Sequence, residues 1–152
     1  NQYPNGQLLF ETPEKLCAVL EQKSDLGLRM VRAYRKRDLA TLRNIAGQEL
    51  SEIIQNVCDL RAAHRAEWFA IYKPFGWEVL DIRYGGLLSR LDSVIQRLND
   101  YLEGRVEHIE ELEEERLFFD GIQRPQAGVG PGFAYNYHRI VSAGALYHAL
   151  PI

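Results

Sequence analysis

The sequence has few cysteines, no long hydrophobic run and no strong excess of charge. Two Cys in 152 residues exclude a small disulfide-stabilised fold. No uninterrupted apolar segment approaches the roughly 20 residues that span a bilayer, so we expect no membrane partner. The first residues, NQYPNG, lack the basic and apolar parts of a signal peptide. With 18 basic and 21 acidic residues, the chain has no general attraction for nucleic acid, and we expect none as a partner.

The two cysteines, Cys17 and Cys58, each lie in a helical pattern among apolar neighbours. We expect two buried, reduced thiols, which suit a reducing compartment and favour a cytoplasmic location. A disulfide between them stays open, because their spacing does not exclude it. Neither belongs to a CxxC pair or a Cys/His cluster, so the sequence predicts no metal site, and no cofactor.

The spacing of the prolines leaves two long stretches free to be helical, from Pro13 to Pro74 and from Pro74 to Pro125. Thr12 resembles an N-cap followed by a proline in the first helical position. Apolar periodicity then predicts a helix from residue 13 to about residue 37. Asp38 is expected to cap a short helix that stops near Gly47.

Two further helices follow in the same pattern. One is predicted over 48–72, where the Lys73-Pro74 step ends it. The next begins between residues 78 and 83, and its apolar seam continues to about residue 116, broken only by Arg105. The sequence therefore predicts an all-α fold, an antiparallel bundle of three to four long helices over about 13–117. Residues 121–132, with four Gly and two Pro, predict a loop, and 133–152 an irregular aromatic and apolar tail. Together, 1–152 form one helical domain.

Two charged runs and one histidine have ordinary structural explanations. Seven Glu fall between Glu103 and Glu115 and are expected to form a solvated acidic face of the last helix. Arg29, Arg32 and Lys36 share one helical face, which we expect to be a solvated helix end. Two other roles for this face stay open: binding of nucleic acid, or pairing with the acidic face. His64 lies on the buried stripe of its helix and is expected to be a hydrogen-bonded core residue.

One region is unusually aromatic. Trp68, Phe69, Tyr72, Phe75 and Trp77 place five aromatic side chains within ten residues, at a helix end and the following turn. We call these five residues the aromatic corner. Charged residues are interleaved with them or follow them. This combination is typical of a domain interface, of core packing or of a ligand site, and the residues alone leave all three open.

A resemblance to a known family favours one of these three interpretations of the aromatic corner, the domain interface. The segment KPFGWEVLDIRYGGLLSRLDSVIQRLNDYLEGRVEHIEELEEE, which begins at Lys73, resembles the helical C-terminal domain of bacterial β-N-acetylhexosaminidases of glycoside hydrolase family 20. The segment CAVLEQKSDLGLRMVRAYRKRDL, from Cys17, is similar to the first helix of the same domain. The motif elements are Lys73-Pro74-Phe75-Gly76, Glu78, Asp81, Arg83, Gly85-Gly86 and the run from Arg105 to Glu114.

The resemblance implies a role beside a catalytic domain. Members of this family are retaining, substrate-assisted enzymes whose (β/α)8 barrel precedes the helical domain. A barrel needs about 250 residues, so we expect this chain to be part of a longer enzyme, to contain no catalytic residue and to be inactive alone. Its partner is then the catalytic barrel of the same chain, and carbohydrate is reached only through the parent enzyme. The candidate interface or sugar-site rim residues are Trp68, Tyr72, Lys73, Phe75, Trp77, Glu78, Asp81, Arg83, Gly85 and Gly86.

Two alternatives to an accessory domain stay open: a stand-alone helical interaction module, and a nucleic-acid binder that uses the stripe from Arg29 to Arg37. A stand-alone helical protein-interaction module would use the aromatic corner as its partner surface and would need no enzyme. A homodimer is compatible with either interpretation.

Overall fold

The computed structural model describes residues 7–114, and in these residues it contains helices and no strand. The all-α prediction is confirmed. The predicted loop over 121–132 and the tail over 133–152 lie outside the described residues. The elements are α1 (Gln7–Lys23), α2 (Leu26–Lys36), α3 (Leu39–Asn44), a π-helical turn η1 (Ile45–Glu49), α4 (Leu50–Ile71), α5 (Trp77–Leu102) and α6 (Glu110–Glu113).

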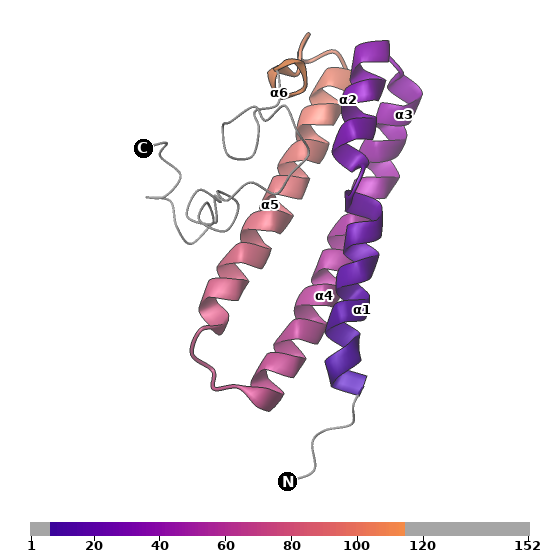
Figure 1. The fold of residues 1–152 in the computed structure, drawn as a ribbon. Coiled ribbons are helices and arrows are strands. Elements are labelled where there is room, and N and C mark those ends of the chain that lie inside the picture. The colour runs from indigo at the N-terminus through magenta and orange to yellow at the C-terminus, as the bar shows by residue number, and fades with distance from the viewer. Residues whose placement is uncertain (1–6, 115–152) are drawn as a thin grey trace, which may run out of the picture. The chain divides into compact units, whose positions relative to one another are not determined.

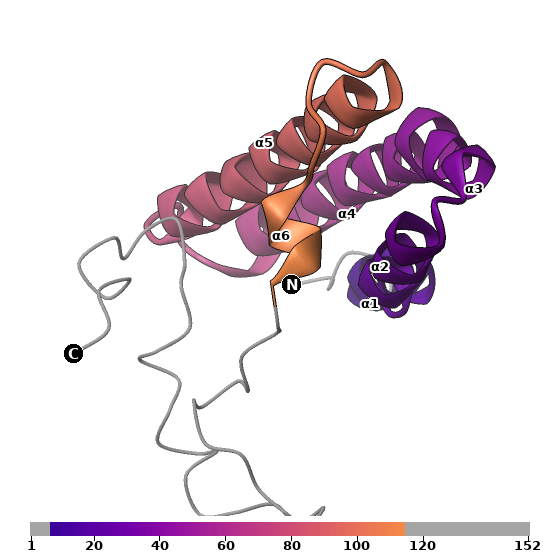
Figure 2. The ribbon, with the colours of Figure 1, turned by 90° about the horizontal axis from the view of Figure 1, so that it is seen from above.

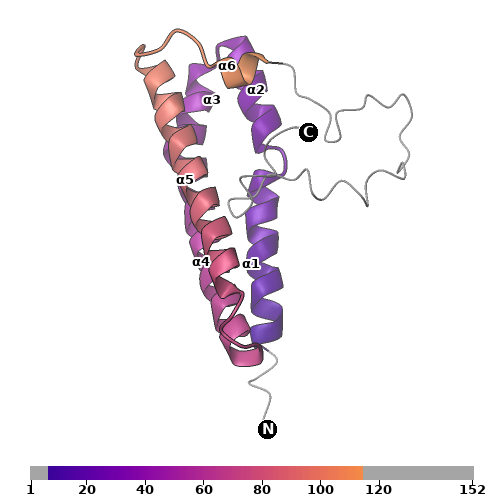
Figure 3. The same ribbon diagram turned by 90° about the vertical axis from the view of Figure 1, so that its left-hand side faces the viewer.

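The long helices run antiparallel to one another. The chain ascends through α1 and α2, descends through α4 and ascends again through α5 (Figure 1). Seen from above, α4 lies between α5 and the α1–α2 pair (Figure 2), and α6 lies across the end of the bundle beside α2 (Figure 3). The α1–α4 contact includes hydrogen bonds from Gln22 to Glu52 (3.3 Å) and from Asn56 to Gln22 (2.8 Å).

The predicted first helix is two helices, α1 and α2, separated at Ser24 and Asp25. Serine, aspartate and the nearby Gly27 are weak helix formers, because their local hydrogen bonds or backbone freedom compete with the helix. The Asp25 carboxylate accepts a bond from Arg29 (2.9 Å) rather than capping α2. The apolar periodicity therefore indicated the helical faces correctly and missed the break between them.

The predicted start of the first helix at Thr12 and Pro13 is wrong. Helix α1 begins at Gln7, and Pro13 lies inside it. Pro13 lies beyond the first turn of α1, so the helix lacks one backbone hydrogen bond there and the proline ring crowds the preceding turn. The Thr12 hydroxyl caps nothing; it is buried and has no hydrogen-bond partner in the described part of the chain.

The connection from α2 to α4 is helical almost throughout. As predicted, Asp38 caps α3: its carboxylate accepts bonds from the Thr41 amide (3.0 Å) and hydroxyl (2.6 Å), which lower the pKa of Asp38. The predicted stop near Gly47 is wrong, since η1 carries the chain into α4 without a loop. Ile45 and Ala46 are both buried, and this burial outweighs the weak helical preference of the glycine that follows.

Helix α4 agrees with its prediction, whereas α5 is shorter than predicted. Helix α5 begins at Trp77, close to the predicted start, but ends at Leu102 rather than near residue 116. Gly104 adopts a left-handed backbone with φ +73, which is typical of a residue just past a helix C-terminus. Arg105 then turns away and pairs with Asp100 and Glu103. The residue that broke the apolar seam thus marks the end of the helix.

The core lies mainly toward the α2–α3 end of the bundle. The side chains most completely removed from solvent come from α3, η1, α4 and the last turns of α5: Leu42, Ile45, Leu50, Ile53, Val57 and Leu98. The predicted burial of the cysteines is wrong. Cys17 and Cys58 are both exposed and unbonded, because each lies on the outer face of its helix.

Candidate interaction surface

The aromatic corner lies where α4 ends and α5 begins. Trp77, the first residue of α5, is buried at 5% exposure. Trp68 packs against it with ring centroids 6.1 Å apart, and Phe69 meets it edge-on at 6.0 Å. In contrast, Phe75 is 83% exposed and Tyr72 is 60% exposed. The corner therefore has an inner part that holds α4 to α5 and an outer part that faces solvent.

The turn between the two helices is held by four hydrogen bonds. The Trp68 indole N–H donates to the Lys73 carbonyl (3.0 Å), and the Trp77 amide donates to the Pro74 carbonyl (3.3 Å). The Glu78 carboxylate accepts from the Gly76 amide (2.8 Å), and the Tyr72 amide donates to the Trp68 carbonyl (2.7 Å). Residues of both helices therefore hold the backbone of the Lys73–Gly76 turn in place.

Gly76 is required by the geometry of this turn. Its φ of +100 lies in a region that side-chain-bearing residues rarely adopt. A Cβ at this position would lie 3.2 Å from Cζ2 of Trp68. The close approach of the Trp68 ring to the Gly76 backbone therefore depends on the missing side chain.

A histidine and a tyrosine extend the inner part of the corner. The Nδ1 atom of His64 lies 3.0 Å from the Tyr84 hydroxyl, and its ring meets Trp77 edge-on at 5.5 Å. The predicted hydrogen bond of His64 is confirmed, whereas its predicted place in the core is not, since the side chain is half-buried. Burial raises the pKa of Tyr84. The Trp77 indole N–H is buried and has no partner among the described residues.

The charged candidates have different surroundings. The Asp81 carboxylate accepts two bonds from Arg61, at 3.0 Å from Nε and 2.7 Å from Nη2, which join α5 to α4. Glu78 caps the turn, as described above. Lys73 and Arg83 are exposed, and neither takes part in an ion pair within residues 9–114. Asp81 and Glu78 therefore stabilise the corner from within, whereas Lys73 and Arg83 are free to meet another surface.

The glycine pair lies further along α5. A Cβ added at Gly85 would find no atom within 4 Å, so no described element approaches this point closely. A glycine pair inside a helix predicts that the barrel or a neighbouring helix approaches its backbone closely, and no helix of the described bundle does so at Gly85. An approach by a body outside the described residues stays a prediction.

Exposed apolar side chains are concentrated at this end of the bundle. The described residues contain twelve large apolar side chains that are exposed, and eight of them belong to the first turns of α1, the end of α4, the turn, or the first turns of α5. Helix α1 begins at the end of the bundle where α4 meets α5 (Figure 1). We call these eight the apolar end: Leu9, Phe10, Phe69, Ile71, Tyr72, Phe75, Val79 and Ile82.

The opposite end is closed by polar contacts to α6. The buried Tyr34 hydroxyl accepts from the Ile109 amide (3.1 Å) and donates to Glu113 (2.6 Å). Arg97 of α5 pairs with both Glu110 and Glu111. The Tyr34 bond, followed by the His108 contact, lowers the pKa of Glu113. The acidic run is exposed as expected, but it forms a loop and a short helix rather than a face of α5; Glu115 lies outside the described residues.

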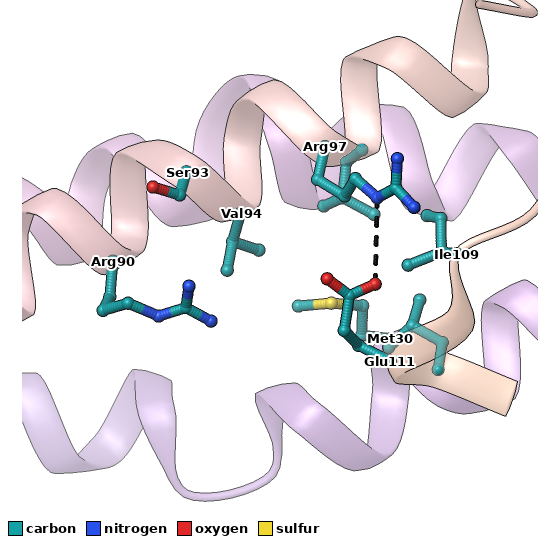
Figure 4. Close-up of a pocket in the computed structure, with 9 residues that line it drawn as sticks. Met30, Arg90, Ser93, Val94, Arg97, Ile109 and Glu111 are labelled. Atoms are coloured by element: carbon teal, nitrogen blue, oxygen red, sulfur yellow. Dashed lines mark ion pairs between the residues drawn. The ribbon is translucent and has the colours of Figure 1, made fainter. Parts of the chain in front are cut away.

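A cavity of about 260 Å³ lies beside this closure, between α2, α5 and α6. Its walls are mostly apolar, from Met30, Val94, Leu98, Ile109 and Leu112. Arg90 extends toward it, and the Arg97–Glu111 ion pair crosses one side (Figure 4). Ser93 also lines the cavity, and its hydroxyl donates to the Ser89 carbonyl (2.9 Å). The one carboxylate of the lining, that of Glu111, is paired with Arg97.

Within the described residues, the basic run of α2 does not pair with the acidic run. Arg29 instead binds Asp25 (2.9 Å) and Glu49 (2.6 Å), which raise its pKa. Arg32 and Lys36 are exposed. Among the described residues, no group of three or more His, Cys, Asp or Glu side chains could hold a metal ion. In the same part of the chain, no helix is long and apolar enough to cross a membrane.

Sequence reasoning missed two residues of the corner, Arg61 and Tyr84. Both lie 20 residues from their partners, Asp81 and His64. The predicted antiparallel pairing of α4 and α5 brings His64 and Tyr84 level, since they lie nine residues before and eight residues after the Lys73–Gly76 turn. Arg61 lies twelve residues before the turn and Asp81 five residues after it, so this pair is offset along the helices. The hairpin geometry therefore predicts the His64–Tyr84 contact, whereas the Arg61–Asp81 pair depends on the register of the two helices.

The comparison with known families agrees with the resemblance found in the sequence. The family model described as the Glycoside Hydrolase 20C C-terminal domain matches residues 1–130, which is most of the chain. No curated protein matches it. The helical fold and the KPFG turn lie within the matched region. The chain therefore belongs to the family of glycoside hydrolase 20C C-terminal domains.

Proposed function

We propose that this chain is the accessory C-terminal domain of a retaining, substrate-assisted β-N-acetylhexosaminidase. It packs on the catalytic barrel of the same chain and supports it, while the barrel removes terminal N-acetylhexosamine. Family membership supports the link to a family 20 hexosaminidase and to a catalytic domain in the same chain. The observation that carries the packing is the concentration of exposed apolar side chains at the apolar end.

Large apolar side chains concentrated at one end of a bundle are rarely left in water. Large exposed apolar patches on soluble proteins mark interaction sites, because their hydration is unfavourable. The apolar end is also where α1 begins (Figure 1). A catalytic domain that precedes a C-terminal domain in the chain connects from the α1 side, so it reaches the apolar end over a short distance.

The acidic residues support a non-catalytic role. A glycosidase acid needs a raised pKa so that it is protonated at neutral pH. The pKa values of Glu110 and Glu113 are instead lowered, by the α6 backbone amide and by Tyr34 respectively. Glu111, next to Glu110, contacts Arg97. These carboxylates hold α6 in place, so the chemistry belongs to the catalytic domain.

The polar candidates of the corner divide into two groups under this proposal. Lys73 and Arg83 contact the catalytic domain directly, because neither has an ion-pair partner in the described bundle. Glu78 and Asp81 act through the turn and through Arg61. The Gly85-Gly86 step lets the catalytic domain approach the α5 backbone, since the space next to Gly85 is open.

The test is a truncated enzyme that ends before Gln7 of this domain. We expect it to unfold at a lower temperature than the full-length enzyme and to lose hydrolysis of an aryl β-N-acetylglucosaminide at temperatures where the full-length enzyme is active. The matched control is a truncation after Glu114, which keeps α1 to α6. Equal stability and equal rates in the shortest and the full-length enzymes would contradict a supporting role.

A further inference from the structure

We propose that Phe75 is the anchor of this domain: its ring fills an apolar socket on the catalytic domain of the same chain. The inference rests on the association proposed above and identifies the residue through which it is made. Of the exposed apolar side chains in the described bundle, Phe75 has the largest exposed fraction, 83%. An aromatic ring fully in water is unfavourable, and its burial by a partner is correspondingly favourable.

The turn presents this ring in a fixed position. The carbonyls of the two residues before Phe75, Lys73 and Pro74, accept bonds from Trp68 and Trp77 respectively. The following amide, of Gly76, is bound by Glu78. A side chain on a rigid backbone with only two side-chain torsions loses little entropy on binding. Interface residues with these properties, aromatic and pre-positioned, usually carry a large share of the binding energy.

The corner therefore separates into a platform and an anchor. Trp68 and Trp77 pack against each other and against His64, so their surface is already used inside the domain. Phe75 takes part in none of the ring contacts found in the described bundle. The two tryptophans thus form the platform, and Phe75 is the ring that remains for a partner.

Further apolar surface adjoins the anchor. Val79 and Ile82 lie three residues apart in the first turns of α5, so they share one face of that helix. They are 43% and 50% exposed. Gly85 lies three residues after Ile82 on the same side of α5. It has no side chain that would keep a partner away from the helix backbone. A socket that receives Phe75 would also cover this face.

The catalytic domain is the occupant that the placement favours. It belongs to the same chain and precedes this C-terminal domain, and α1 begins beside the corner (Figure 1). Leu9 and Phe10, in the first turns of α1, are exposed at the same end. One covering body would therefore bury the start of α1 and the anchor together. A second copy of the chain and an unrelated protein are the outcomes that would contradict this assignment.

The experiment measures the accessibility of position 75 in the full-length enzyme. Phe75→Cys and Leu28→Cys are each introduced after every native cysteine is replaced, because Cys17 and Cys58 are exposed and would react. Leu28 is the control, since it is 51% exposed in α2, away from the corner. We expect a maleimide to label position 75 at least tenfold more slowly than position 28 in the native enzyme, and at an equal rate in denaturant.

Two results of the labelling experiment would overturn the inference. Equal native labelling rates would show that nothing covers position 75. Protection that disappears on dilution of the enzyme would show that a second copy, rather than the same chain, covers it. A second pair of variants, Phe75→Leu and Phe75→Asp, tests whether an apolar side chain at position 75 couples the two domains. We expect the leucine variant of the full-length enzyme to unfold in a single cooperative transition. We expect the aspartate variant to unfold in two transitions, because a charge does not fit an apolar socket. A single transition in both would also overturn the inference.

The truncated enzyme described above keeps this test distinct from that of the proposed function. If truncation is harmful and position 75 is open, the domain supports the enzyme through another surface, and only the anchor is wrong. If truncation is harmless and position 75 is protected, the domain docks without supporting, and only the proposed support is wrong. If truncation is harmless and position 75 is open, both are wrong.

Discussion

Replacing Gly76 with alanine tests the structure of the turn that presents Phe75. The native φ of +100 costs a residue with a side chain about 1–3 kcal/mol. The new Cβ would also lie 3.2 Å from the Trp68 ring, so the ring must shift, and part of its packing on Trp77 is lost. Alanine restricts the unfolded chain and returns about 0.4–1 kcal/mol. We therefore expect a net loss of roughly 1–2 kcal/mol in the free energy of unfolding.

The assay is urea unfolding of this chain, followed by tryptophan fluorescence, since both tryptophans of the chain lie in the corner. We expect the midpoint to fall with an unchanged slope, because the exposed surface stays the same. Gly104→Ala is the matched control: its φ is +73, and nothing lies within 4 Å of its Cβ position. It should lose less than Gly76→Ala. A Gly76→Ala chain as stable as the unmodified chain would refute the account of this turn.

Three further predictions concern this chain alone. Gly85→Ala should raise the urea midpoint, by up to about 1 kcal/mol in stability, because alanine favours the helix and the space is open; a lower midpoint would show that the space is filled. Tyr34→Phe should cost about 1–3 kcal/mol, because it leaves the buried Ile109 amide without its acceptor, and faster hydrogen exchange of that amide is the specific check. Burial raises the pKa of Tyr84 from its ordinary 10.0, so its contribution is present below pH 10.0 and lost as the pH rises through the folded value; Tyr84→Phe should flatten this alkaline loss in a series of urea midpoints, and an unchanged loss would contradict it.

Parts of the fold could be predicted because single local signals decide them. Asp38 caps α3 through its own side chain, and the apolar period of α4 is long and uninterrupted. The end of α5 was harder, because Gly104 and Arg105 compete with an apolar seam that resumes at Ile109. Ile109 is indeed buried, but in the returning segment that leads to α6. Periodicity records which residues are buried and does not record whether the helix between them is continuous.

The arrangement of the candidate site was also only partly predictable from the sequence. The sequence predicted the aromatic corner as a cluster, but it could not divide Trp77, which is buried, from Phe75, which is not. That division depends on the left-handed Gly76, which turns neighbouring residues to opposite sides. Asp81 was predicted to meet another domain, which stays a prediction, and its ion pair with Arg61 inside the bundle was not predicted. A pairing between helices needs the register of α4 against α5, which no single stretch of sequence contains.

The most direct test of the central claim compares hydrolysis of p-nitrophenyl-β-N-acetylglucosaminide by the full-length enzyme and by this chain alone. An accessory C-terminal domain predicts turnover by the full-length enzyme and none above the uncatalysed rate by residues 1–152. Turnover by this chain alone would show that it contains catalytic residues of its own. No turnover by the full-length protein, on this or the galactosaminide substrate, would contradict the hexosaminidase assignment.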